Sequence, residues 1–244
     1  MRHAPLRPTP GHALRAAALV IAVGYAAAFG AVQSASAQRL PSGPEVTLDQ
    51  LMKPTELADI AIGSPDAKVT IVEYSSLTCP HCATFANDIF PGLKAKYIDT
   101  GKVRFITRDF PLNNLAAAAS MLVRCGDKDK AFALVDTMFA TQKDWAFTEG
   151  NPVPKLFDLA KDAGFTKESF DACLKDQALL DKVLAARKYA DETLHVNSTP
   201  SFFVNGKRVV SVGSVDDLAK VVDPLLDPQK ADAGATPVAA PDGK

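Results

Sequence analysis

The sequence has no excess of charge of either sign, and it contains few cysteine, methionine and histidine residues. Its 27 Lys and Arg residues nearly balance 28 Asp and Glu residues, for a formal net charge of −1. This balance gives no electrostatic reason to expect a nucleic acid or an acidic partner. The 244 residues include four Cys, four Met and four His, and we find no internal repeat. So few Met residues argue against copper handling, which favours additional Met or His ligands.

The N-terminal segment has the pattern of an export signal. Three arginines accompany an apolar stretch at residues 16–32, and the small-x-small sequence Ala35-Ser36-Ala37 follows it. We therefore predict a signal peptide at residues 1–37, cleaved after Ala37. An uncleaved membrane anchor is the alternative, but the stretch is short for a span and rich in alanine. Export would place all four cysteines in an oxidising compartment, where disulfides persist.

The chain between the signal and the C-terminus divides into an arm, one domain and a tail. Residues 38–58 are polar and contain several prolines, which predicts an extended arm with a short helical piece at 48–52. Residues 227–244 are rich in Ala, Pro and Asp, and we expect a disordered tail. The remaining residues, 59–226, suffice for one domain with a large insertion.

The first half of this domain has the pattern of a strand–helix–strand unit. Ile60–Ile62 is a candidate edge strand, and the apolar run Val69–Ser75 predicts a strand buried on both faces. A helical pattern follows from about Cys79 to Tyr97, in which Pro91 predicts a kink or a break. Val103–Asp109 alternates and is rich in β-branched residues, so it predicts the next strand. This is a right-handed βαβ unit, and the fold class is α/β.

The second half begins with helices and returns to strands. Residues from about 112 to 194 show only helical patterning, which predicts an all-helical inserted subdomain. Ser201–Val204 then predicts a strand, Asn205-Gly206 a two-residue hairpin turn, and Lys207–Val210 the partner strand. Val215–Val222 predicts a final helix. The helical segments within the insertion are residues 115–125, 130–142, 153–164, 167–176 and 178–193.

The candidate reactive group is the Cys-x-x-Cys pair formed by Cys79 and Cys82 at the start of a predicted helix. The amides and macrodipole at a helix N-terminus favour negative charge, so the first thiol is expected to ionise readily. The alternative is a zinc site completed by Cys125 and Cys173. Structural zinc sites usually draw on two close pairs, whereas these two cysteines are far apart on predicted helices. We therefore favour a redox role and expect no metal.

A second candidate feature is Thr199-Pro200, directly before the strand at 201–204. Proline cannot donate a hydrogen bond to a sheet, so its place at the start of a strand needs a reason. One interpretation is a cis peptide bond that turns the backbone of Thr199 toward the cysteine pair. The other is an ordinary trans proline at the edge of the sheet.

These features together resemble the thioredoxin superfamily. The helical insertion makes the chain similar to the DsbA-like periplasmic thiol:disulfide oxidoreductases, which implies a thioredoxin fold with an inserted helical subdomain. The likeness extends over about residues 59–226. The stretches that carry it are GSPDAKVTIVEYSSLTCPHC, KYIDTGKVRFITRDFPLN, FDACLKD and NSTPSFFVNGK.

The resemblance implies roles for the residues of the CPHC sequence. Cys79 would be the exposed nucleophile and Cys82 its buried partner, with Pro80 and His81 tuning the redox potential. The imidazole of His81 would stabilise the Cys79 thiolate. Because a stable thiolate favours the reduced form, the disulfide would then be a strong oxidant.

The resemblance also implies roles for residues outside CPHC. Thr199 and cis-Pro200 would form the wall that binds substrate. Glu73 would be a buried acid that relays the proton of Cys82, or, alternatively, an edge carboxylate that faces water. Cys125 and Cys173 would form a structural disulfide, with two free buried thiols as the alternative.

The implied function is oxidation of reduced, newly exported proteins through a mixed disulfide at Cys79. A DsbB-like quinone-coupled membrane protein would reoxidise the pair, and no cofactor is implied. We expect a monomeric periplasmic protein. The alternatives are a disulfide isomerase or reductase, and a thioredoxin-fold chaperone or assembly factor. Isomerases and reductases usually dimerise through a sizeable N-terminal domain, and the arm before residue 59 is short for one.

Overall fold

The computed structural model describes residues 46–227 of the chain. The predicted signal peptide, the first part of the predicted arm and all but the first residue of the predicted tail at 227–244 lie outside these residues. No helix within the described part is long and apolar enough to cross a membrane.

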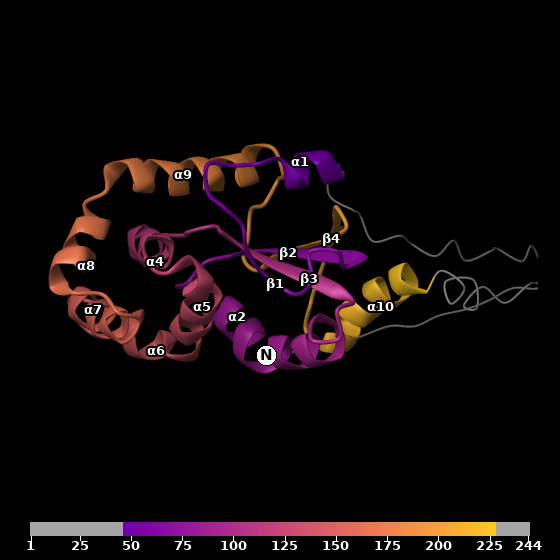
Figure 1. The fold of residues 1–244 in the computed structure, drawn as a ribbon, viewed down its shortest axis with the longest axis horizontal. Helices are drawn as coiled ribbons and strands as arrows, with labels where there is room; N and C mark the ends of the chain where they lie inside the picture. Colours follow the sequence, from indigo (N-terminus) through magenta and orange to yellow (C-terminus); the bar gives the residue numbers. More distant parts are fainter. Residues whose placement is uncertain (1–45, 228–244) are drawn as a thin grey trace, which may run out of the picture. The chain divides into compact units, whose positions relative to one another are not determined.

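A five-stranded mixed sheet lies at the centre of the structure (Figure 1). Its strand order is β1-β3-β2-β4-β5, and β2 and β3 run parallel while the other pairs are antiparallel. The bounds of the first four strands agree with the predictions, and β5 ends at Val209, one residue earlier than predicted. The strands are β1 (Ile60–Ile62), β2 (Val69–Ser75), β3 (Val103–Asp109), β4 (Ser201–Val204) and β5 (Lys207–Val209).

Strand β2 is buried on both faces, as its near-continuous apolar sequence predicts. On one face Ile71 packs in a cluster with Phe85, Phe105 and Phe202. On the other face its neighbour Val72 packs in a separate cluster formed with the arm and the end of the insertion. Successive side chains of a strand point to opposite faces, so a strand between two helical layers must be apolar throughout.

A single helical stretch from Pro80 to Ile98 covers the first face, together with α10 (Val215–Leu226). This stretch consists of α2 (Pro80–Thr84), α3 (Phe90–Leu93) and two π-helical pieces, η1 (Phe85–Ile89) and η2 (Lys94–Ile98). Of the kink or break predicted at Pro91, the break is wrong, because the helix continues through this residue. The wider π-helical turn before Pro91, in which Phe90 donates to the carbonyl of Phe85, accommodates the ring.

Helix α10 is longer than predicted. It continues beyond Val222 for another turn and includes Pro224. Leu226 in this turn packs against the same cluster as Leu218 and Val222. The apolar contact offsets the hydrogen bond that the proline cannot make.

The insertion is entirely helical, as predicted, and its helices α4 to α8 gather on one side of the sheet in Figure 1. The prediction of a single helix at 130–142 is wrong, because the chain turns at Thr141. The hydroxyl of Thr141 donates to the carbonyl of Thr137 at 2.8 Å, and its backbone N–H donates to the same oxygen at 3.0 Å. The elements are α4 (Asn114–Cys125), η3 (Lys128–Lys130), α5 (Ala131–Ala140), α6 (Gln142–Trp145), α7 (Val153–Asp162), α8 (Lys167–Leu174) and α9 (Gln177–Glu192).

The described part of the arm contains the predicted short helix, α1 (Leu48–Met52), beside the second face of the sheet. Leu51 is buried there, and Arg108 of β3 donates to its carbonyl oxygen. The same guanidinium forms an ion pair with Asp59, at 2.7 Å. These contacts tie the arm to the sheet.

Candidate active site

The loop after β2 places Cys79 at the N-terminus of the long helix. Cys79 is the N-cap residue of α2, with extended backbone angles (φ −88°, ψ 121°), and Pro80 is at the first helical position. Proline is favoured there because its fixed φ suits a helix and its missing N–H has no partner to lose. The backbone N–H of Cys79 donates to Ser76 O at 2.9 Å, which closes the loop. Cys82 follows in the first turn, and both cysteines are free thiols.

The environment of Cys79 stabilises its thiolate. A hydrogen bond from the Cys82 thiol is the largest effect, and it is joined by the backbone N–H groups of Cys82 and His81 and by the side chain of Thr199. Together they outweigh the opposing effect of burial and lower the pKa of Cys79 from 9.0 to about 5. The expectation of an exposed nucleophile is wrong: Cys79 is only 5% exposed.

Cys82 is fully buried, and its environment acts in the opposite direction. Burial raises the pKa of Cys82 far above its usual value, and the bond to Cys79 and the charge of Glu73 add to the effect. A thiol that holds its proton so firmly donates a hydrogen bond to its ionised neighbour. The two thiols, one helical turn apart, therefore differ strongly in acidity.

Glu73 of β2 is a buried side chain, 3% exposed. Its surroundings include a group of phenylalanine rings from the long helix, β3 and α5. This desolvation raises the pKa of Glu73 from 4.5 to about 8, against a weaker opposing hydrogen bond with Thr107. One carboxyl oxygen, Oε1, has no hydrogen-bond partner among the described residues. The alternative of an edge carboxylate that faces water is therefore wrong.

The peptide bond between Thr199 and Pro200 is cis. It brings the backbone of Thr199 to the nucleophile, and the Cys79 thiol donates to Thr199 O at 3.4 Å. The Thr199 hydroxyl is buried and has no hydrogen-bond partner in this thiol form. Since a hydroxyl rotates freely, it can turn to donate to a thiolate, in agreement with its lowering of the pKa of Cys79.

Arg208 of β5 holds the loop that carries Thr199 and Pro200. Its guanidinium donates to His195 O at 2.7 Å and to Ser201 Oγ at 3.2 Å, on either side of the cis bond. His195 itself has a positive φ of 55°, and it contributes its backbone carbonyl to this contact with Arg208. No local sequence pattern marks Arg208 as part of the site.

His81 lies in the first turn of α2 and is exposed. Its contribution to the acidity of Cys79 comes from its backbone N–H. Among the described residues no hydrogen bond joins its imidazole to Cys79, so the stabilising role of the imidazole stays a prediction.

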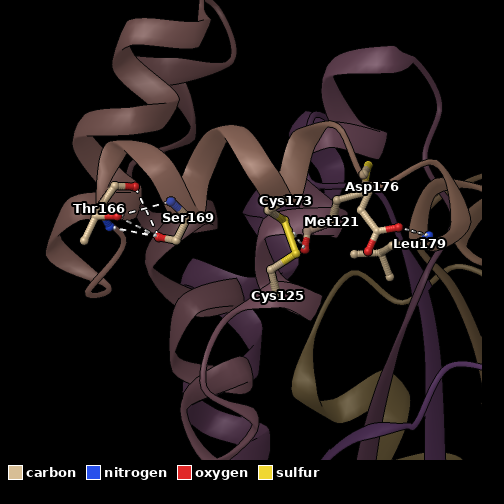
Figure 2. The surroundings of a disulfide bond; sticks show 7 residues. All are labelled: Met121, Cys125, Thr166, Ser169, Cys173, Asp176 and Leu179. Atoms are coloured by element: carbon tan, nitrogen blue, oxygen red, sulfur yellow. Dashed lines mark hydrogen bonds between the residues drawn. A yellow bond between two sulfur atoms is a disulfide. The ribbon is translucent and has the colours of Figure 1, made fainter.

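Cys125 and Cys173 are joined by a disulfide, which links the end of α4 to α8 (Figure 2). The S–S distance is 2.12 Å and the Cα atoms are 6.1 Å apart. A capping box between Thr166 and Ser169 starts α8, and the carbonyl oxygen of Met121 lies 3.3 Å from the Cys173 sulfur. These sulfurs are engaged with each other, so they do not complete a zinc site with the other pair. The described residues contain no cluster of three or more His, Cys, Asp or Glu that could hold a metal.

Two amide side chains of the insertion also reach the active-site loop. Gln142, the first residue of α6, donates to Leu77 O at 2.8 Å and to Cys79 O at 3.0 Å. Asn113, which caps α4, donates to Thr78 Oγ1 at 3.1 Å. Neither residue is among the site residues predicted from the sequence. The Asn113 cap was detectable as a helix-start residue, whereas no local pattern marks Gln142.

Comparisons with known proteins identify the family. The family model described as "Thioredoxin" matches residues 55–224. A putative protein-disulfide oxidoreductase of Rickettsia bellii is 31% identical over 193 residues, which cover 79% of this chain and 74% of that protein. Disulfide bond formation protein D of Bacillus subtilis is 30% identical over 68% of this chain and 76% of its own length. Other Rickettsia relatives are longer, and the match spans 62% to 67% of their length.

The crystal structure of Wolbachia pipientis alpha-DsbA1 has the same architecture. It is 28% identical and superposes with a TM-score of 0.67, covering 77% of this chain and all of that one. The predicted thioredoxin fold with its helical insertion is thus confirmed. The chain belongs to the thioredoxin family, among the protein-disulfide oxidoreductases of the DsbA type.

Proposed function

We propose that the chain donates the Cys79–Cys82 disulfide to reduced proteins that have just been exported. The observation that carries this proposal is the opposite acidity of the two thiols beside the cis Thr199–Pro200 bond. An ionised Cys79 stabilises the dithiol form of the pair. A stable dithiol makes the corresponding disulfide a strong oxidant.

The reaction begins when a substrate thiolate attacks Sγ of Cys79 in the oxidised pair. The Cys79–Cys82 bond breaks, a substrate–Cys79 disulfide forms, and Cys82 leaves with the electron pair. Cys82 has a high affinity for a proton and takes one up at this point. Glu73 is protonated near neutral pH and interacts with Cys82, so it is placed to supply that proton.

A second substrate thiolate then attacks the substrate sulfur of the mixed disulfide. Cys79 leaves as a thiolate, and its low pKa makes it a good leaving group. In total the substrate loses two electrons and two protons, and the cysteine pair gains the electrons. The backbone of Thr199 faces this sulfur and would contact the substrate chain on either side of the attacking cysteine.

The site of action and the partners belong to the same proposal. The pattern at residues 1–37 supports export to the periplasm, where reduced substrates emerge. Repeated turnover requires an external oxidant, and a DsbB-like quinone-coupled membrane protein would fill this role. Unfolded exported chains and this oxidant are the expected partners of a monomeric enzyme.

The deciding experiment measures both the reduction potential of the Cys79–Cys82 pair and its ability to oxidise a reduced protein. The equilibrium of the Cys79 pair with glutathione gives its reduction potential, and reduced ribonuclease supplies a substrate whose activity returns on oxidation. We expect a potential well above that of a cytosolic reductant and recovery of activity with the oxidised protein, but none with Cys79→Ser. A strongly reducing potential would favour a reductase, and reactivation of scrambled ribonuclease alone would favour an isomerase. A folded protein that exchanges with no thiol would favour a chaperone.

A further inference from the structure

The insertion is hydrogen-bonded to every residue of the loop between β2 and α2. Leu112 N donates to Ser76 Oγ at 3.3 Å, and Asn113 donates to Thr78 Oγ1. Gln142 donates to the carbonyl oxygens of the other two residues, Leu77 and Cys79. The reactive cysteine is thus held from the insertion as well as from its own helix.

Of these three residues, Gln142 alone bonds to Cys79 itself. It is 3% exposed, and both of its partners are carbonyl oxygens, which can only accept hydrogen bonds. The amide nitrogen must therefore face the loop, and its two hydrogens account for the two bonds. Cys79 O also accepts the first backbone bond of α2, from Ala83 N at 3.2 Å. Gln142 is bonded to the atom where the loop becomes the helix.

The position of Gln142 is itself held firmly. The turn at Thr141 separates α6 from α5, and Gln142 directly follows this turn. Trp145, one turn further along α6, is buried and donates from its indole nitrogen to Met138 O of α5 at 2.9 Å. A side chain supported in this way can hold its partners in one geometry.

We propose that Gln142 is a positioning residue for Cys79, through which the helical insertion holds the nucleophile over the N-terminus of α2. The Cys79 thiolate depends on the N–H groups of His81 and Cys82, and those bonds require a particular backbone conformation at Cys79. Without Gln142, Leu77 O has no other described partner, and the loop is free to move to find one. The sulfur then aligns less well with the amides of α2. This inference rests on the proposed role of Cys79 as the nucleophile.

The test compares three variants. Gln142→Met keeps the length of the side chain and removes the donors, and Gln142→Asn withdraws them by one methylene. Asn87→Ala is the matched control, because Asn87 of η1 donates to Phe139 O of α5 at 3.2 Å. It also joins the long helix to the insertion by a side-chain amide, but it does not touch the loop. Each full-length mature protein is reduced, and the thiolate absorbance near 240 nm is followed against pH.

We expect Gln142→Met to raise the midpoint pH of the Cys79 thiolate titration. At a pH below the midpoint, the thiolate fraction should then fall about three- to tenfold. The exchange constant with glutathione should shift by the same factor, toward a less oxidising pair; tenfold corresponds to about 30 mV. Gln142→Asn should move both in the same direction by less, and Asn87→Ala should leave both unchanged.

A Gln142→Met protein with the wild-type midpoint and exchange constant, and only reduced stability to denaturant, would overturn the proposal. If this variant does not fold, the Gln142→Asn titration decides by the same criterion. Failure of the proposed function has a different signature, since it affects the wild type. A wild-type protein with an acidic Cys79 that oxidises no substrate leaves the positioning role of Gln142 intact.

Discussion

At the scale of single residues, the acidity of Cys79 depends mainly on its partner thiol. The hydrogen bond from Cys82 lowers the pKa of Cys79 more than any other contact does. We predict that the thiolate absorbance of the reduced protein has a midpoint near pH 5, the pKa given by the structure. Replacing Cys82 by Ala removes the donor and should raise this midpoint by about one unit. An unchanged midpoint in Cys82→Ala would show that the helix amides alone are sufficient.

Glu73 gives a prediction about stability and pH. The unfolded chain loses this proton near pH 4.5, whereas the folded protein keeps it to about pH 8. Unfolding therefore releases a proton between these values, and this group lowers the free energy of unfolding as pH rises through that window. Glu73→Gln removes the effect, so the variant should be more stable than wild type by about 2–4 kcal/mol at pH 8.

The measurement is urea unfolding of both proteins at several pH values. The difference should be small near pH 4.5, grow up to pH 8 and then remain constant. Glu149→Gln, which removes one exposed carboxylate, is the control for the loss of a negative charge. A pH-independent difference for Glu73→Gln would mean that the folded protein ionises this group as readily as the unfolded chain does.

The sequence predicted those site residues that belong to a short, recognisable pattern of neighbouring residues. The spacing of Cys79 and Cys82 after an apolar strand, and the proline that begins β4, are visible in the letters alone. The role of Gln142 could not be predicted from such a pattern, because its hydrogen-bond partners are 63 and 65 positions away in the sequence. A polar residue at the end of an apolar helix looks like a solvated side chain until the turn at Thr141 is known.

At the scale of elements, the disulfide between α4 and α8 should stabilise the insertion. It joins residues separated by 48 positions, and closing a loop of that length removes chain entropy equivalent to about 4 kcal/mol. We predict that the double variant Cys125→Ser and Cys173→Ser loses about 2–4 kcal/mol in free energy of unfolding. Denaturation of both proteins with the Cys79 pair in the same redox state measures this. Equal stabilities would show that packing in the insertion suffices without the bond.

The elements themselves were predicted best where periodicity is strong. The strands β1 to β4 and the two-residue hairpin turn follow directly from alternation and turn chemistry. The errors lie where tertiary contacts outweigh local preferences. A helix continues past Pro91 through a π-helical turn, and α10 continues past Pro224 because Leu226 packs on the core. At Thr141 both the hydroxyl and the backbone N–H donate to Thr137 O, and no sequence pattern marks the turn between α5 and α6.

At the scale of the whole molecule, the sheet, the insertion and the cis-proline loop converge on one sulfur. We predict that Cys82→Ala accumulates mixed disulfides with exported proteins at Cys79. Its Cys79 thiolate attacks a disulfide of an exported protein, one thiolate of that protein leaves, and no Cys82 thiol is present to release the adduct. Non-reducing electrophoresis of extracts, followed by mass spectrometry of the adducts, tests this. Cys79→Ser with Cys82 intact should trap none, and absence of adducts in both would contradict attack at Cys79.

The near-complete burial of Cys79 has a consequence for timing. Only 5% of this residue is exposed, so an attacking sulfur has a narrow approach to it. A cysteine within a folded domain is held back by its neighbours, whereas an extended chain can present one side chain at a time. Oxidation would then be restricted to the interval between the arrival of a client and the completion of its fold. The burial of Cys79 would therefore limit when each substrate protein can be oxidised. Once the core of that protein has formed, its cysteines could no longer reach this sulfur.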